Sequence, residues 1–327
     1  MFNIPTNRRS LFGAALLPLA PGVASAQEAW PARSPRFIVP GPAGGAGDVI
    51  ARIVMERVGA RIGQPIVIEN RAGAGTNIGM TVLARSPADG YTIGLASIAS
   101  HAVNITLYKN MPFDPVRDFA PVTLMALVPN LMVVPASLPI QTVADFIAYA
   151  RTRPGQINFG SVGAGSSQHL AGAQFSQATG IEMQHIPYTN GGQMNTDLIE
   201  NRVQVLFQSV SAVTELAKAG RMRPLAVTGM ERAPAFPEVP TLREAGVDIV
   251  STGWFGVLAP AGTPEPILER LFQETTAVLR EPEIAARIIA GGSVPQPSAS
   301  RAAFAAFMAA ETARWRPVVV ATGASVD

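Results

Sequence analysis

Cysteine is absent from this 327-residue chain, and histidine occurs only three times, as His101, His169 and His185. Without thiols the chain can form neither disulfides nor Cys-based metal sites, and it has no Cys nucleophile. Three scattered histidines also argue against a His-rich metal site. A mature core of about 300 residues does not need such cross-links, so we expect neither a metal site nor a disulfide framework.

An excess of positive charge is missing as well. The chain has 25 basic and 23 acidic residues, and two of the basic ones are Arg8 and Arg9 near the N-terminus. Without that N-terminal segment, 23 basic residues balance 23 acidic ones. Nucleic-acid binders usually carry a basic patch or stripe, so we expect no nucleic acid among the partners.

The N-terminus has the three parts of a secretory signal in the right order. Arg8 and Arg9 form a basic start, residues 11–20 are apolar, and residues 24–26 (ASA) fit a cleavage site. The apolar run is interrupted by prolines and is well short of the roughly 20 residues of a membrane span. We therefore predict a signal peptide over residues 1–26 and export by the Sec or the twin-arginine route; a short buried helix is the alternative.

Short apolar runs alternate with helical periods after this segment. Ile50, Val54, Val58 and Ile62 recur at i, i+4 behind the apolar run at residues 37–39. Further strands are expected at residues 66–68 and 91–95, with a glycine turn and a short helix between them. This βαβαβ order is typical of a parallel sheet that is covered by helices.

The pattern repeats, and then the chain ends in helices. Strands are expected at residues 131–134, 157–159, 183–186, 203–207 and 225–227 with helices between them, a return strand at 253–258, and helices near 265–280, 282–290 and 301–316. We therefore predict an α/β protein of two lobes, each a mainly parallel sheet flanked by helices. Residues 27–125 and 251–327 would form the first lobe and residues 126–250 the second, with hinge crossovers near 125 and 250.

Two strands, one in each predicted lobe, end in a glycine-rich loop that opens a helix, at residues 41–48 and 160–167. Glycine lets a backbone approach a ligand closely, and a helix N-terminus offers unpaired N–H groups to an anion. Residues 40–48, 97–101, 161–169 and 188–193 contain no lysine or arginine. We therefore expect an anion to be held by backbone N–H groups and by the hydroxyls of Ser97, Ser100, Ser161, Ser166 and Ser167.

Simpler interpretations of these features stay open. The loops could be ordinary tight turns, Asp48 a helix-terminal carboxylate, and Ser166 or Ser167 an N-cap. His169 and Tyr188 could be ordinary half-buried and core residues. No glycine run has the G-x-G-x-x-G, P-loop or G-x-S-x-G spacing, and a Ser166–His169 pair lacks a third member. We therefore predict that the protein is not an enzyme and has no catalytic residues; a hydrolase is the remaining alternative.

Several longer stretches resemble one known family. They are IVP at residues 38–40 with Gly44, Gly45 and Asp48; ENRAGAGTNIG at 69–79; DGYT at 89–92; PFDPVRDFAPV at 112–122; GAGSSQHLAG at 163–172; PY at 187–188; LAVT at 225–228; and WFGVLAPAGTP at 254–264. Together they resemble the Bug family, the TctC-like periplasmic receptors of tripartite tricarboxylate transporters. The resemblance covers nearly the whole chain behind the signal.

The resemblance implies a periplasmic binding-protein type II fold, a Venus flytrap, with no cofactor. It implies a small organic acid as ligand, membrane subunits of a tripartite tricarboxylate-type transporter as partners, and a monomer in the periplasm. A sensory protein that presents its closed form to a two-component kinase is the alternative. The candidate ligand-binding residues are Ala43, Gly44, Gly45, Asp48, Ser97, Ser100, His101, Ser161, Gly165, Ser166, Ser167, His169, Tyr188 and Gln208. Departures from the family pattern at Gly41, at residues 189–192 and at Gln208 concern the identity of the ligand.

Overall fold

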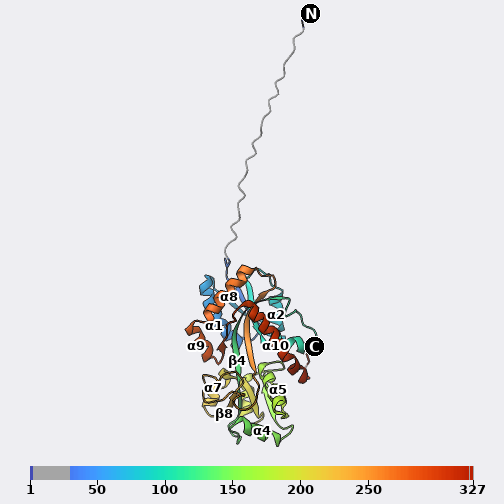
Figure 1. The fold of residues 1–327 in the computed structure, drawn as a ribbon, viewed down its shortest axis with the longest axis vertical. Helices are drawn as coiled ribbons and strands as arrows, with labels where there is room; N and C mark the ends of the chain where they lie inside the picture. Colours follow the sequence, from blue (N-terminus) through green and yellow to red (C-terminus); the bar gives the residue numbers. More distant parts are fainter. Residues whose placement is uncertain (3–29, 324, 327) are drawn as a thin grey trace.

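The computed structural model describes residues 1–2, 30–323 and 325–326, so nearly all of the predicted signal peptide lies outside the described residues. The protein has an upper and a lower half, and strand β4 (Phe119–Pro135) runs down through both (Figure 1). We call the upper half lobe 1, with β1–β3, β9, β10 and the first part of β4. Lobe 2 contains the last part of β4 with β5–β8.

Lobe 1 begins with the predicted βαβαβ unit. Strands β1 (Arg36–Val39), β2 (Val67–Asn70) and β3 (Thr92–Ser97) pair in parallel, with β1 in the middle. Helices α1 (Ala46–Ile62), η1 (Ala74–Thr76) and α2 (Asn77–Ala84) connect them, and β3 leads into η2 (Ala99–Val103) and α3 (Asn104–Leu107). The predicted strands and helices are confirmed here. The structure adds η2 and α3, which were not predicted.

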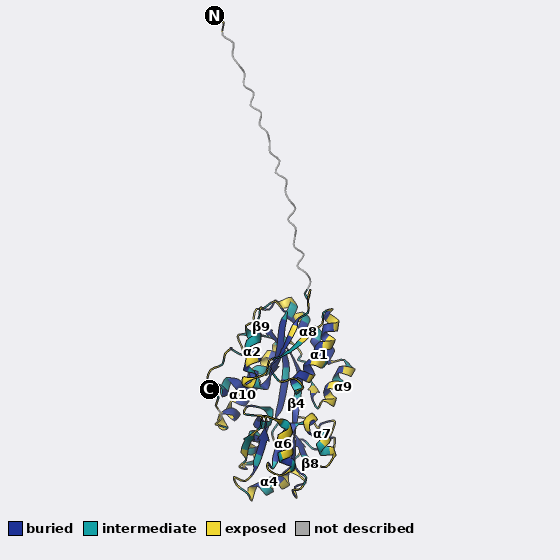
Figure 2. Cartoon of the chain, turned by 180° about the vertical axis from the view of Figure 1, so that it is seen from behind, coloured by how far each residue is buried: buried dark blue, intermediate teal, exposed yellow. Residues whose placement is uncertain are grey.

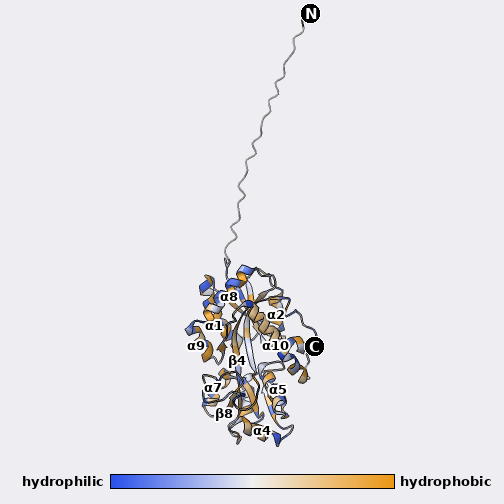
Figure 3. Cartoon of the chain, viewed as in Figure 1, coloured by the Kyte–Doolittle hydropathy of each residue, from blue (hydrophilic) through white to orange (hydrophobic). Residues whose placement is uncertain are grey.

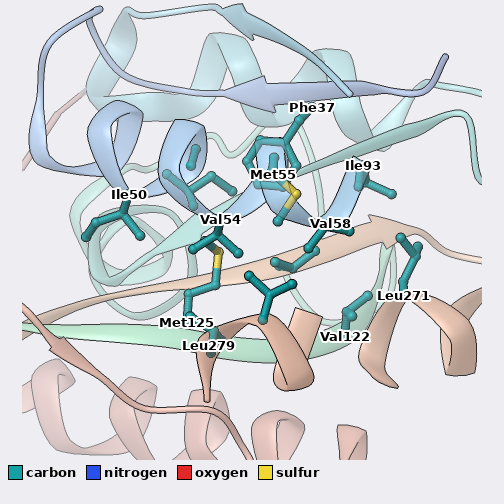
Figure 4. Close-up of a cluster of buried hydrophobic side chains, with 14 of the residues drawn as sticks. Phe37, Ile50, Val54, Met55, Val58, Ile93, Val122, Met125, Leu271 and Leu279 are labelled. Carbon is teal, nitrogen blue, oxygen red and sulfur yellow. The ribbon is translucent and has the colours of Figure 1, made fainter. Parts of the chain in front are cut away.

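Helix α1 follows directly from its sequence pattern. Ile50, Val54 and Val58 are buried on one face and pack in a cluster with Phe37 and Leu271 (Figure 4). Each such side chain contributes roughly 1.5–3 kcal/mol when fully buried. The helix ends where a glycine, with φ 81°, adopts the left-handed conformation that glycine tolerates best.

Strand β4 is the main difference from the sequence-based expectation, which placed a strand only at residues 131–134. It has 17 residues and contains three prolines, a residue that is rare within a continuous strand. Pro121 lies where the pairing with β9 shifts register, and Pro129 is the last residue that pairs with β9. Pro135 ends the strand. The prolines therefore occupy a bulge, a change of partner and a terminus, where a missing N–H is tolerated.

Lobe 2 is the second predicted α/β unit. Its helices are α4 (Val143–Arg151), α5 (Ser167–Thr179), α6 (Gly191–Ile199) and α7 (Val210–Lys218), and its strands are β5 (Asn158–Ser161), β6 (Gln184–Pro187), β7 (Val205–Ser209) and β8 (Met222–Val227). β5 pairs in parallel with β6 and β7, whereas β7 and β8 pair antiparallel to β4. The capping box expected before α4 is present, with Thr142 and Asp145 exchanging both hydrogen bonds.

The C-terminal part pairs with the strands of lobe 1. Strand β9 (Thr252–Pro260) pairs antiparallel with β3 and β4, and α8 (Glu265–Leu279), α9 (Pro282–Ala290), the short β10 (Val294–Pro295) and α10 (Arg301–Ala321) follow. The indole N–H groups of Trp254 and Trp315 both donate to Glu311 of α10, at 3.1 and 2.9 Å. This buried carboxylate fixes α10 against the returning strand.

The chain crosses between the lobes within β4 and again at the start of β9, after residues 228–251, whose buried side chains pack in the core of lobe 2. At the crossover the Asn130 amide donates to the Thr228 hydroxyl, and that hydroxyl donates to the Ser251 carbonyl. The Thr228 amide donates to the Asn130 carbonyl and the Ser251 amide to the Thr228 carbonyl, at 2.8 Å each. The predicted boundaries near 125 and 250 stay a prediction, and these hydrogen bonds are the nearest landmarks.

Burial and hydropathy agree with the two-lobed layout. The strands are mostly buried and the exposed residues gather on the outward sides of the helices (Figure 2), which carry both polar and apolar residues (Figure 3). Within the described part of the chain, no helix is both long enough and apolar enough to cross a membrane.

Candidate functional site

The carboxyl ends of the parallel strands are where an open α/β sheet binds ligands. All fourteen candidate residues lie at such ends. Ala43, Gly44, Gly45 and Asp48 follow β1; Ser97 ends β3, and Ser100 and His101 follow it; Ser161, Gly165, Ser166, Ser167 and His169 follow or end β5; Tyr188 follows β6 and Gln208 lies near the end of β7. The fold therefore brings together residues that are up to about half the chain apart.

The two lobes contact each other at these ends. A methyl group placed on Gly165 of lobe 2 would lie 3.0 Å from side-chain carbons of Val103 and Leu107 in lobe 1. The start of α1, with Gly44, faces the start of α7, with Ser211, across a cavity of about 250 Å³. The strand ends thus form an interlobe cleft.

The first glycine-rich loop is held by a carboxylate. Asp48 is only 3% exposed, and it accepts hydrogen bonds from the Gly44 amide (2.9 Å), from Arg52 (3.0 Å) and from the Asn70 side chain (3.0 Å). Burial acts to raise the pKa of Asp48, but the hydrogen bonds from Arg52, Gly44 and Asn70 outweigh it and lower the pKa. Asp48 is therefore ionised and fixes the loop.

The start of α1 is left open to a ligand. Its N-cap is Gly45, and no side chain caps the first turn. The N–H groups of the first turn have no partner inside a helix, and the helix dipole makes this end attractive to an anion. Helix α7 likewise begins at Ser209 without a side-chain cap.

The second glycine-rich loop is held by neutral groups. The Gly163 amide donates to the Ser161 hydroxyl (3.1 Å), which also lies 2.7 Å from Nε2 of His185. The Gly165 amide donates to Nδ1 of His169 at 3.1 Å. The Ser166 hydroxyl donates to the Gly163 carbonyl and caps α5 by accepting from the His169 amide at 3.3 Å. Ser166 is thus an N-cap, and its hydroxyl makes no hydrogen bond to the His169 ring.

The two histidines of this loop are neutral. Their rings lie 4.1 Å apart, and Phe159 packs against both. Burial, with a contribution from His185, lowers the pKa of His169 to about 4, and burial also lowers the pKa of His185. Neutral His169 has an acceptor nitrogen for the Gly165 amide, so its protonation would break this hydrogen bond.

Ser97, Ser100 and His101 lie at the end of β3 and in η2, which follows it. The Ser97 amide donates to the Ser100 hydroxyl at 3.0 Å, and the same hydroxyl lies 2.8 Å from Nδ1 of His101. The His101 ring is 3% exposed and packs edge-on against Phe119 at 5.0 Å, beside Phe113. Burial lowers the pKa of His101 to about 3. Its ring therefore lies in the aromatic core of lobe 1.

Tyr188 and Gln208 line the lobe 2 side. The Tyr188 hydroxyl donates to Asp197 at 2.8 Å, and burial together with this carboxylate raises its pKa to about 12. The Gln208 side-chain oxygen accepts from the Gln168 side chain of α5 (3.2 Å) and from the Ser209 amide (2.9 Å). Gln208 thus bridges β7 and the start of α5.

Sequence reasoning did not single out Asn130, which lies on β4 at the crossover between the lobes. Its side chain is fully buried, and neither of its amide atoms has a hydrogen-bond partner among the described residues. The signal available in the sequence was a polar amide within the apolar run of residues 127–134.

The site is equipped for binding rather than for chemistry. It offers helix N-termini, glycine amides and hydroxyls, and the described residues contain no group of three or more His, Asp or Glu that could hold a metal ion. Two α/β lobes that share strand β4, with a cleft between them, define a two-lobed solute-binding protein.

The sequence places this protein in a specific family. The family described as "Tripartite tricarboxylate transporter family receptor", TctC, matches residues 50–324. A UPF0065 protein from the tcbD-tcbE intergenic region of Pseudomonas sp. (strain P51) is 36% identical over 96% of this chain and 94% of its own length. Protein BugT of Bordetella pertussis is 35% identical over 91% of this chain and 92% of its own. The chain belongs to the TctC family, as the resemblance predicted.

Solved structures agree on the fold. Rpa4515 of R. palustris with adipate has a TM-score of 0.82 and 38% identity, covering 90% of this chain and 99% of its own. MatC (Rpa3494) from Rhodopseudomonas palustris with bound malate has a TM-score of 0.77 and 28% identity, covering 89% and 100%. The periplasmic binding protein BugD has a TM-score of 0.78 and 28% identity, covering 90% and 99%. These relatives are solute-binding proteins, so the prediction of a two-lobed type II fold without enzymatic activity is confirmed.

Proposed function

We propose that this protein is a periplasmic receptor that closes on a small carboxylate and delivers it to a tripartite tricarboxylate-type transporter. The observation that carries the proposal is the pair of glycine-rich loops, one per lobe, each opening a helix at the interlobe cleft. Two of the similar structures contain adipate and malate, both dicarboxylates, which supports the same class of ligand for this chain.

The candidate residues divide into two roles in this proposal. The hydroxyl of Ser167 and the first-turn amides of α1 and α5 that no side chain caps would donate to the ligand. Ser97 and Ser100 are buried and bonded to each other, so they would support the turn after β3. Asp48 and His169 would act through the loops, because they already accept the Gly44 and Gly165 amides. Ala43, Gly45, Ser161, Ser166, Tyr188 and Gln208 would shape the cleft, and His101 would support η2 from within the core.

Recognition by dipoles has an energetic basis. A hydrogen bond to a charged group contributes roughly 1.5–3 kcal/mol, and four or five of them would support a micromolar Kd, about −8 kcal/mol, after the costs of binding. The glycine-rich segments themselves supply no lysine or arginine, so backbone amides and hydroxyls would provide these bonds.

The test is a thermal-shift screen of the mature protein with di- and tricarboxylates, aromatic acids and amino acids. At least one acid should raise Tm, and calorimetry should give its Kd. Native mass spectrometry of protein purified without refolding should find a co-purified acid. If no acid shifts Tm and none co-purifies, carboxylate binding is wrong.

Export is tested separately. The predicted signal ends at Ala26, so N-terminal sequencing of the protein from the periplasmic fraction should begin at Gln27. Recovery of the intact N-terminus from the cytoplasm would contradict the proposed location without touching the ligand proposal.

A further inference from the structure

Asn130 is a buried polar side chain without a partner. Its relative exposure is 0%, and neither Nδ2 nor Oδ1 makes a hydrogen bond with any described residue. Nearly all buried polar atoms in proteins are hydrogen-bonded, and an unpaired one needs an explanation. Its backbone, in contrast, is paired, because the Asn130 amide donates to Thr228 at 2.8 Å.

The position of Asn130 on β4 follows from strand alternation. Side chains two residues apart lie on the same face of a strand. Ala126 and Val128 belong to the core cluster beside α1 in lobe 1, and Met132 belongs to the core cluster beside α5 in lobe 2. The pairing register of β4 is regular from 126 to 132. Asn130 therefore lies on the face shared by both cores, in the gap between them.

Three helix N-termini surround this face. Ser167, the first residue of α5, packs over Gly253, where an added methyl group would lie 3.4 Å from its Cβ, and Gly253 pairs with Val128. Ser209, which pairs directly with Asn130, is the uncapped start of α7. The start of α1 packs against Phe255 two residues along β9. Asn130 thus lies on the strand face toward which these three helix starts converge.

We propose that Asn130 is a ligand-recognition residue that makes the cleft selective for hydroxycarboxylates. The inference rests on the proposed function. A side-chain amide presents both a donor and an acceptor. A carboxylate oxygen can accept from Nδ2, but only a ligand with a donor of its own can satisfy Oδ1. A hydroxyl close to the carboxylate supplies that donor.

Selectivity follows from the cost of leaving the amide unpaired. A site that hydrogen-bonds a ligand hydroxyl discriminates strongly against the analogue that lacks it, because its buried polar groups are then unpaired. A single neutral hydrogen bond contributes on the order of 1 kcal/mol, so we expect at least about a fivefold to tenfold preference for the hydroxylated acid.

The experiment measures Kd by calorimetry for acids that differ by one hydroxyl: malate against succinate, lactate against propionate, and 3-hydroxyadipate against adipate. The wild type should prefer the hydroxylated member of the pair that it binds. Asn130→Leu, which has nearly the same shape, should bind more weakly and lose the preference. A Thr275→Val variant is the matched control, since the Thr275 hydroxyl is also fully buried and unpartnered but lies in α8, in the core of lobe 1.

A second measurement separates recognition from a structural role. Replacing an unpaired buried polar group by an apolar one of similar shape is neutral or stabilising, so Asn130→Leu and Thr275→Val should both keep or raise Tm without ligand. If Asn130→Leu does not fold, Asn130→Ala serves for the same comparison. Thr275→Val should keep the preference for the hydroxylated acid. If the wild type binds acids but ignores the hydroxyl, or if Asn130→Leu or Asn130→Ala keeps the preference, the inference is overturned and the receptor proposal stands. If the wild type binds no acid, both fall.

Discussion

The two glycine-rich loops both connect a strand to a helix at the interlobe cleft, but different side chains hold them in place. The lobe 1 loop is tied by the ionised Asp48, which gathers one backbone amide, one guanidinium and one side-chain amide. The lobe 2 loop is tied by the neutral pair His169 and His185 and by serine hydroxyls. A negative ligand is thus approached by one loop with a buried negative charge behind it and by one without. Arg52 pairs with that charge at 3.0 Å, so the difference lies in how the loops are held, by an ion pair in lobe 1 and by neutral groups in lobe 2.

Removing the carboxylate of lobe 1 should have the largest effect. Asp48→Ala leaves the Gly44 amide, Arg52 and Asn70 without their shared acceptor, so we expect the unfolding free energy to fall by about 2 kcal/mol or more. Ligand affinity should fall by roughly a hundredfold, the equivalent of one or two lost charge-assisted hydrogen bonds from a misplaced loop. Calorimetry and urea unfolding measure both.

Asp145 of lobe 2 provides the control for that variant. It is also a carboxylate near a helix start, where it completes the capping box of α4, but it lies away from the cleft. Asp145→Ala should weaken α4 and leave ligand affinity unchanged. Equal affinity of the Asp48→Ala variant and the wild type would show that the lobe 1 loop is not held by this carboxylate.

A ligand can touch both loops only when the two lobes close on each other. A second variant tests a contact between the lobes. Gly292, in the turn after α9, has φ 74°, and a Cβ there would lie 2.8 Å from Cβ of Val210 and 2.9 Å from the Ser211 amide nitrogen. Gly292→Ala should therefore disfavour closure and weaken ligand binding by about tenfold, since roughly 1.4 kcal/mol of overlap suffices.

Gly220 is the matched control for this contact. Its φ is 68°, and nothing lies within 4 Å of an added Cβ. Gly220→Ala should cost similar backbone strain and leave Kd unchanged. Small-angle scattering with and without a bound acid should show compaction for the wild type and for Gly220→Ala, and less for Gly292→Ala. If both variants bind equally well, the Gly292 contact does not control closure.

The loop supports should also differ in their response to acid. The pKa of His169 is about 4, below its ordinary 6.5, so between pH 6.5 and 4 the unfolded chain binds a proton that the folded protein does not. Stability contributed by this group is complete above pH 6.5 and is lost as the pH falls through that window. The pKa of Asp48 is already lowered, so the lobe 1 loop keeps its charge there.

His169→Gln keeps an acceptor for the Gly165 amide and removes the titration. Its unfolding free energy should fall less steeply between pH 6.5 and 4, by up to about 1.4 kcal/mol per pH unit. The slope will not vanish, because buried His101 has a pKa of about 3 and titrates in the unfolded chain over the same range. Equal slopes for the variant and the wild type, measured by urea unfolding at several pH values, would contradict the role of His169.

Local features of this protein were readable from the sequence, whereas long-range register was not. The spacing of Ile50, Val54 and Val58 predicted helix α1, and the glycine and serine runs predicted both loops. Asp48 and Ser166 were noted, but that Asp48 would be tied to Asn70, 22 residues away, depends on the pairing of β1 with β2.

Strand β4 and Asn130 show why some features of the fold and the site could not be predicted from the sequence. Three prolines broke the pattern of β4, and their tolerance depends on which neighbour each faces, which only the assembled sheet decides. The importance of Asn130 depends on which face of β4 its side chain occupies. Because side chains alternate between the two faces of a strand, that face is known only once the register on both sides of the lobe boundary is known. The polar amide within an apolar run marks the position as unusual, but the run alone does not show that the position lies between two cores.

The return of β9 to lobe 1 also has a consequence for how the chain is made. Strand β3 has β1 on one side and β9 on the other, and β9 is the 252–260 segment. A growing chain completes all the strands of lobe 2 while that edge of β3 is still unpaired, and unpaired edges invite aggregation. The half of the molecule that begins first in the sequence is therefore finished last, and its nascent sheet must be shielded until residues 252–260 have emerged.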